Sequence, residues 1–173
     1  MPTPPIDRLL DTLRRSYDGE AWHGPALAEA LAGLDARDAV RRPIANAHSP
    51  WELLLHVTAW THEVTRRLHG AAPALPPAGD WPAVPDLTGA ERTRAWSEAR
   101  TALDTARDAL LTAVAAFDPA RLDERLPPTA SDDQDSDAAL GVRHTFHGML
   151  VGLAEHNAYH GGQLVLLRRA IDG

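Results

Sequence analysis

The sequence contains no cysteine and no lysine, and all 17 of its basic residues are arginine. Without cysteine the chain has no disulfide, no thiolate metal site and no cysteine nucleophile, so any metal site must use histidine, aspartate, glutamate and water. Without lysine it has no Schiff-base lysine and no lysine general base. The chemistry open to the chain therefore depends on its nine histidines, its carboxylates and its bound ligands.

Three further absences bear on location and partners. No apolar run approaches the roughly 18–20 residues that a membrane-spanning helix needs. The N-terminal segment has no apolar stretch that ends in a small-residue cleavage site, so we expect a cytoplasmic protein with no membrane partner. The net charge is −7, whereas phosphate binding normally demands a basic surface, so we also expect no nucleic-acid partner.

Four long segments have the apolar periodicity of amphipathic helices. They are residues 6–17, the segment that follows Ser49 and ends at Gly70, the segment from Thr88 to Phe117, and the segment that starts between Ala138 and Gly141 and ends near Arg169. One or two short helices are expected within 25–40, and no strand pattern or internal repeat is evident. With 173 residues, 44% of them hydrophobic, the sequence predicts an all-α fold, a single domain over 1–173 built as a four-helix bundle.

Two of the long helices begin with a predicted capping box. Ser49 is a favourable N-cap residue, and Glu52 lies three residues later, as the S-x-x-E pattern requires. Thr88 and Glu91 have the same spacing at the start of the third long helix. Both sites predict a helix start that is fixed by reciprocal hydrogen bonds.

The two longest connections are rich in residues that oppose helix formation. Residues 71–87 contain five prolines, which predicts a loop that Trp81 holds in place. Residues 127–137 are polar, acidic and begin with two prolines, which predicts a mobile surface loop. Connections of this length favour a bundle with at least one crossover connection.

Three histidines lie on the apolar faces of the predicted helices. His156 and His160 are one turn apart on the apolar stripe of the last helix, and His56 lies on the stripe of the second helix. The other histidines are expected to face solvent or to lie in connections: His23, His48, His62, His69, His144 and His147.

Three imidazoles that converge inside a bundle match a catalytic metal site, which has three protein ligands and one open position. The alternative is that each is an ordinary core histidine bonded to a backbone carbonyl, and for one histidine alone this alternative is favoured. The three together narrowly favour the metal, because each unsatisfied group would cost roughly 1–3 kcal/mol. The pair is not an H-E-x-x-H zinc-protease motif, since Glu155 precedes His156 instead of following it.

Gly161 and Gly162 follow His160 directly. A glycine costs about 1 kcal/mol relative to alanine inside a helix, so two in succession suggest close approach of a neighbouring helix or open space beside a metal. The apolar pattern continues through Leu164 and Leu167, which predicts one continuous helix.

Three segments resemble the signature segments of the DinB/YfiT-like superfamily, and the resemblance covers essentially the whole chain. They are HSPWELLLHVTAW (48–60), DWPAVP (80–85) and EHNAYHGGQLVLLRR (155–169). The resemblance implies an up-down-down-up four-helix bundle that holds a divalent metal, zinc or nickel, on three histidines. These carry over to His56, His156 and His160. The resemblance also implies a homodimer and, for some relatives, a low-molecular-weight thiol as cosubstrate.

Residues and resemblance together predict a divalent-metal-dependent enzyme that acts on small electrophilic molecules. It would be a thiol S-transferase of the bacillithiol or mycothiol type, or a related hydrolase, with metal-bound water or thiolate as the reacting group. Secondary candidates for contact with a ligand are Gln163, Tyr159 and His48. Glu155 stands where related sequences commonly have glutamine, and we expect it at the surface or behind the ligands. The alternative is a non-catalytic bundle that binds a metal or small molecule in a stress-response or interaction role.

Overall fold

The computed structural model describes residues 5–129, 141 and 143–173, which form five α-helices and one short 3-10 helix. Their bounds are α1 Pro5–Asp18, α2 Leu27–Leu31, α3 Pro50–Leu68, α4 Gly89–Ala115, η1 Pro119–Arg121 and α6 Phe146–Asp172. Within the described residues no strand forms, and the only β-type pairing is an isolated bridge between Arg125 and Thr145. The prediction of an all-α helical bundle is confirmed.

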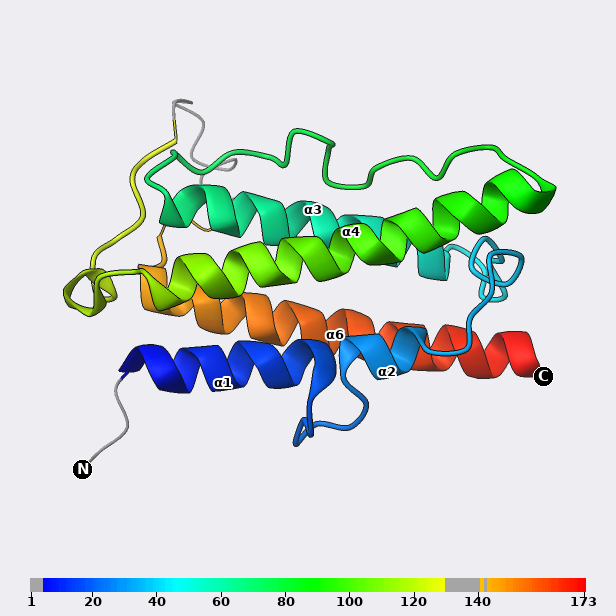
Figure 1. Ribbon diagram of the computed structural model, residues 1–173, viewed down its shortest axis with the longest axis horizontal. Coiled ribbons are helices and arrows are strands. Elements are labelled where there is room, and N and C mark those ends of the chain that lie inside the picture. The colour runs from blue at the N-terminus through cyan, green and yellow to red at the C-terminus, as the bar shows by residue number, and fades with distance from the viewer. Residues whose placement is uncertain (1–4, 130–140, 142) are drawn as a thin grey trace.

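The four long helices lie side by side along the length of the molecule (Figure 1). Helix α3 contacts α4 and α6, and α1 contacts the same two helices, which closes the bundle. The colours in Figure 1 show that the chain runs in one direction in α1 and α6 and in the other direction in α3 and α4. Because α3 and α4 are parallel, the segment 71–87 between them has to return along the whole bundle, and we call it the crossover segment.

The buried faces of the helices are those that the apolar periodicity predicted. Helix α1 buries Ile6, Leu9, Leu10, Leu13 and Tyr17, and α4 buries Trp96, Leu103, Ala106, Leu110 and Ala113. Full burial of one such side chain contributes about 1.5–3 kcal/mol, so this shared core is what holds the four helices together.

The start of α3 forms as predicted. The Ser49 hydroxyl accepts a hydrogen bond from the amide of Glu52 at 3.3 Å, and the Glu52 carboxylate accepts one from the amide of Ser49 at 2.8 Å. Beyond the other end of this helix, Gly70 has a φ of +90°, in the left-handed region that favours glycine. Both ends of the helix that carries His56 are therefore fixed locally.

The predicted capping box at the start of α4 is wrong. Thr88 is the N-cap residue, but its side chain makes no capping hydrogen bond. Gly89 directly after it has a φ of +55°, so the backbone leaves the right-handed helical path just where the hydroxyl would need to lie over the first turn.

The predicted start of the last helix between Ala138 and Gly141 is also wrong, because α6 begins at Phe146. The amide of Leu126 donates to the carbonyl of His144 at 3.1 Å, and the amide of Phe146 donates to the carbonyl of Glu124 at 3.1 Å. These bonds fix the backbone on both sides of Thr145, which is itself extended, and Thr145 caps the helix by accepting from the amide of Gly148 at 3.1 Å.

The remaining boundaries differ little from expectation. Helix α6 runs without a break through Gly161 and Gly162, as predicted, and ends at Asp172 instead of near Arg169. Helix α4 ends at Ala115, two residues before the predicted Phe117, and α2 lies within 25–40, where short helices were expected. Of the predicted loop over 127–137, residues 130–137 lie outside the described residues, as do Ala138 to Leu140.

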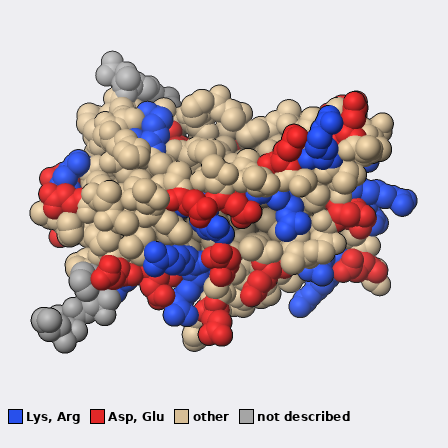
Figure 2. All heavy atoms as spheres, in the orientation of Figure 1, with Lys and Arg blue, Asp and Glu red and all other residues tan. Residues whose placement is uncertain are grey.

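Charges of both signs are interspersed over the face that Figure 2 shows, so arginine side chains lie beside acidic ones. Ion pairs between helices or turns include Arg107 with Asp18 at 2.8 Å and Arg121 with Glu124 at 2.8 Å. In the part of the chain that the structure describes, no helix combines the length and apolar character needed to cross a membrane.

Candidate metal centre

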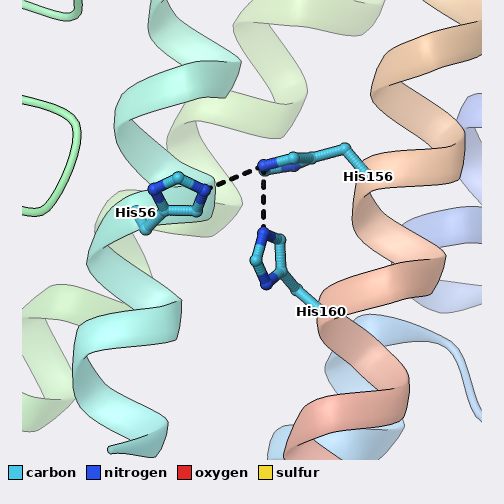
Figure 3. Close-up of side chains that lie close together, drawn as sticks. All are labelled: His56, His156 and His160. Atoms are coloured by element: carbon cyan, nitrogen blue, oxygen red, sulfur yellow. Dashed lines mark hydrogen bonds between the residues drawn. The ribbon is translucent and has the colours of Figure 1, made fainter. Parts of the chain in front are cut away.

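The structure brings together the three histidines that helix periodicity singled out. His56 comes from the middle of α3, and His156 and His160 come from successive turns of α6 (Figure 3). Nε2 of His156 lies 2.9 Å from Nε2 of His56 and 3.1 Å from Nε2 of His160. One ligand atom of each imidazole lies within 4.8 Å of the other two, a spacing that could hold a metal ion.

Two of the imidazoles are oriented by hydrogen bonds on their outer nitrogen. Nδ1 of His56 donates to the backbone carbonyl of Asp80 at 2.6 Å, and Nδ1 of His160 donates to Oε1 of Gln163 at 2.7 Å. With the proton on Nδ1, the lone pair of Nε2 points toward the centre of the cluster, the arrangement typical of metal-ligating histidine. Nδ1 of His156 is buried and has no hydrogen-bond partner.

The site favours neutral imidazoles. Burial, together with the nearby imidazoles of His160 and His56, lowers the pKa of His156 to about 3. Burial also lowers the pKa of His160 to about 4, against the opposing effect of its hydrogen bond to Gln163. The pKa of His56 is lowered by burial, although its contacts with Asp80 oppose the shift. All three side chains are therefore uncharged at pH 7, which is the form that binds a metal ion.

Hydrogen bonds alone cannot satisfy this cluster. Because His56 and His160 both donate from Nδ1, two acceptor nitrogens face Nε2 of His156, which carries at most one proton. One of the two short nitrogen–nitrogen contacts is then a repulsion between acceptors. Three ligands of a tetrahedral zinc ion, each about 2.0–2.1 Å from the metal, lie roughly 3.3 Å apart, close to the 2.9 and 3.1 Å that separate Nε2 of His156 from the other two rings. A divalent cation thus fits these residues, and imidazole donors suit zinc, nickel, copper and iron.

An aromatic stack covers one side of the site. The ring of Trp81 lies 3.9 Å from the ring of His56 at an interplanar angle of 11°, and 3.5 Å from the ring of His48 at 5°. Next to it, the carboxylate of Asp80 accepts a hydrogen bond from Nε1 of Trp60 at 2.7 Å. The crossover segment is thus held against α3 at the level of His56, and the prediction that Trp81 holds this segment in place agrees with its contacts.

A cavity of about 380 Å³ lies beside His156 and is lined by residues of α3 and α6. Its wall is mainly apolar and includes Trp60, Val64, Met149 and Leu153. Gly152 also lines it, and a methyl group added at Gly152 would meet no other atom within 4 Å. The cavity is therefore a space for a small molecule that reaches one histidine of the cluster directly.

The secondary candidates have different surroundings. Gln163 accepts a hydrogen bond from His160, and Tyr159 is 65% exposed with its ring 5.0 Å from that of His160. His48 stacks on Trp81, and Glu155 is exposed at the edge of the cavity. The remaining five histidines, His23, His62, His69, His144 and His147, are exposed.

Sequence reasoning did not predict that Asp80 and Trp81 contact His56. The signal that could have found these contacts is the segment DWPAVP (80–85), where a carboxylate and an aromatic residue are adjacent in a loop rich in alanine and proline. A polar–aromatic pair in such a loop has no core to bury into, so it calls for a specific contact.

Comparison with known proteins agrees with this geometry. The sequence profile of the DinB superfamily matches residues 21–164, which include all three histidines and the crossover segment. No curated protein and no solved structure matches the chain. Because the profile covers most of its length, and the helical bundle and the histidine cluster fit a metal-binding family, the chain belongs to the DinB superfamily.

Proposed function

We propose that this protein is a divalent-metal-dependent enzyme, a thiol S-transferase or a related hydrolase that acts on small electrophilic molecules. The observation that supports it best is the convergence of three neutral imidazoles beside a cavity. Among the described residues, no fourth histidine, aspartate or glutamate joins the cluster. A set of three protein ligands is typical of catalytic zinc sites, whereas structural sites use four.

The protein residues divide into three roles in this proposal. His56, His156 and His160 hold the metal, and Asp80 and Gln163 orient the rings of two of them. A divalent cation supplies Lewis-acid chemistry at such a site and lowers the pKa of a thiol or water that binds it. The mainly apolar wall of the cavity would hold the electrophile beside His156.

The composition and the cavity also limit the reactants. Because the chain has no cysteine, a sulfur nucleophile must come from a cosubstrate, which we propose is a low-molecular-weight thiol. A volume of about 380 Å³ is within the usual range for small-molecule sites, and its aromatic and aliphatic wall suits an apolar electrophile. Zinc or nickel as the metal, and a homodimer as the assembly, complete the proposal.

Metal analysis of the purified protein tests the site. We expect about one divalent ion per chain in the wild type and in His62→Ala, and none in His56→Ala. His62 is the matched control because it lies on the same helix and faces solvent. A wild-type protein that binds no stoichiometric zinc or nickel, or a His56→Ala variant that keeps it, would contradict the proposal.

The reaction needs a separate assay. We expect the metal-loaded protein to consume bacillithiol or mycothiol in the presence of a chlorinated aromatic electrophile, and His56→Ala to lose this activity. Hydrolysis of esters or amides without thiol consumption would assign the protein as a hydrolase. Metal binding with neither activity would favour the non-catalytic alternative.

A further inference from the structure

We propose that Trp81 is a positioning residue for the histidine cluster, which fixes the plane of the His56 ring by stacking between it and His48. This inference rests on the proposed function, since it assigns Trp81 a role in metal binding. It concerns a residue that does not itself offer a ligand atom.

The three rings form a continuous stack. His48 lies on one face of the indole at 3.5 Å and His56 on the other at 3.9 Å, and the interplanar angles of 5° and 11° make the rings nearly parallel. Trp81 is 38% exposed, so its edge reaches solvent while imidazoles cover both faces. Its contacts with this stack place it in the surroundings of the cluster, outside the leucine-rich core of the bundle.

Two successive residues of the crossover segment restrain His56 in complementary ways. The carbonyl of Asp80 accepts from Nδ1 and sets the direction in which that nitrogen points. A single hydrogen bond still allows the ring to tilt about it, and a flat surface against the ring removes that freedom. Together the two contacts determine where Nε2 lies relative to His156.

The restraint is anchored on α3 itself. The carboxylate of Asp80 accepts from the indole of Trp60, which lies one turn after His56 on the same helix. Trp81 is thus attached to the helix whose histidine it contacts, and its position follows that of His56. Groups that orient metal ligands from behind typically change metal affinity 10–100-fold when they are replaced.

Two substitutions at Trp81 separate stacking from simple space filling. Trp81→Phe keeps a flat aromatic face, whereas Trp81→Leu keeps apolar volume and loses the face. We expect the zinc dissociation constant, measured by competition with a chromogenic chelator, to rise 10–100-fold in Trp81→Leu and by less than about threefold in Trp81→Phe. Trp22→Leu is the control, because Trp22 is fully exposed, and its zinc affinity should equal that of the wild type.

A second measurement needs no metal. In the metal-free protein the indole ring current should shift the carbon-bound ring protons of His56 upfield in the NMR spectrum, and this shift should vanish in Trp81→Leu and persist in Trp81→Phe. Circular dichroism verifies that each variant is folded.

The outcomes distinguish this inference from the proposed function. A wild-type protein that binds no zinc overturns the proposed metal site and this inference with it. A wild type that binds zinc, with Trp81→Leu binding equally tightly, overturns only the role of Trp81. Unchanged His56 resonances in a folded Trp81→Leu variant would also overturn the role of Trp81.

Discussion

Gln163 accepts a hydrogen bond from Nδ1 of His160 at 2.7 Å, and the two residues lie one turn apart on α6. The same helix therefore supplies both a candidate metal ligand and the group that selects its tautomer. His56 obtains the equivalent acceptor from the crossover segment, and His156 has none. Hydrogen bonds at Nδ1 thus restrain the rings of His56 and His160 but not that of His156.

Replacing Gln163 should weaken metal binding without removing a ligand. In Gln163→Leu the Nδ1 proton of His160 loses its acceptor, so we expect the zinc dissociation constant to rise about 10–100-fold. Gln163→Glu retains an acceptor and should bind zinc at least as tightly as the wild type. Equal affinity of Gln163→Leu and wild type in the same chelator competition would refute this role.

Adding and removing metal should change thermal stability. An ion that binds only the folded state at 100 times its dissociation constant contributes about 2.7 kcal/mol, or roughly 5–10 °C in Tm for a chain of this size. We expect zinc to raise the Tm of the wild type by this amount and a chelator to reverse the effect. His156→Ala should show no response, and His147→Ala, at an exposed position of the same helix, should respond like the wild type.

The metal-free protein should lose stability as the pH falls. The pKa values of His156 and His160 are about 3 and about 4 in the folded state, whereas a free imidazole titrates near 6.5. The unfolded chain therefore binds the extra protons, so stability is complete above about pH 6.5 and is lost as the pH falls toward the folded pKa values. Between pH 7.5 and 5 we expect a loss of roughly 2 kcal/mol for each of these histidines.

Urea unfolding at several pH values measures this dependence. The free energy of unfolding of metal-free His156→Ala should fall less steeply with decreasing pH than that of the wild type between pH 7.5 and 5. Identical curves for the two proteins would show that His156 does not contribute.

Neutralising Glu63 should destabilise the fold. This carboxylate is fully buried and accepts hydrogen bonds from Arg67 at 2.7 Å, Arg66 at 2.8 Å and the amide of Ala74 at 3.0 Å. Burial alone would raise the pKa of Glu63, but these bonds hold it below its ordinary value. Breaking one partner of a buried ion pair costs about 3–5 kcal/mol, which we expect for Glu63→Gln in urea unfolding. Glu91→Gln, at an exposed position, should change stability by less than about 0.5 kcal/mol.

Two glycines should respond in opposite directions to alanine. Gly162 is exposed within α6, and an added methyl group would meet nothing within 4 Å, so Gly162→Ala should stabilise the protein by about 0.5–1 kcal/mol. Gly70 has a φ of +90°, so Gly70→Ala should destabilise it by about 1–2 kcal/mol. If Gly162→Ala is instead destabilising, the space around this position serves a purpose other than helix stability.

The sequence was sufficient to predict the histidine cluster because helix geometry alone relates the residues of one face. The apolar stripes of two helices, which have the period of an α-helix, are interrupted by His56, His156 and His160. The helix face on which each histidine lies can therefore be predicted without the tertiary structure. The start of α6 could not be predicted in this way. Its cap, Thr145, lies between His144 and Phe146, whose backbone hydrogen bonds to Leu126 and Glu124 join segments about 20 residues apart in the sequence.

The residues that surround the cluster could not be predicted from the sequence either. Asp80 contributes its backbone carbonyl to His56, and every residue type has that group, so no letter of the sequence indicates it. The helical period does not indicate that Glu63 is buried, because a buried carboxylate is stable only with partners such as Arg67 and Ala74, which the period does not reveal.

The length of the crossover segment also affects this site. Since His56 is oriented by a main-chain carbonyl, the number of residues between Gly70 and Asp80 decides which carbonyl reaches it. One inserted residue would present a different peptide group to His56 and a different side chain to Trp60 and His48, with all three histidines unchanged. Insertions and deletions in an irregular connection can therefore alter the properties of this site as directly as substitutions among the histidines.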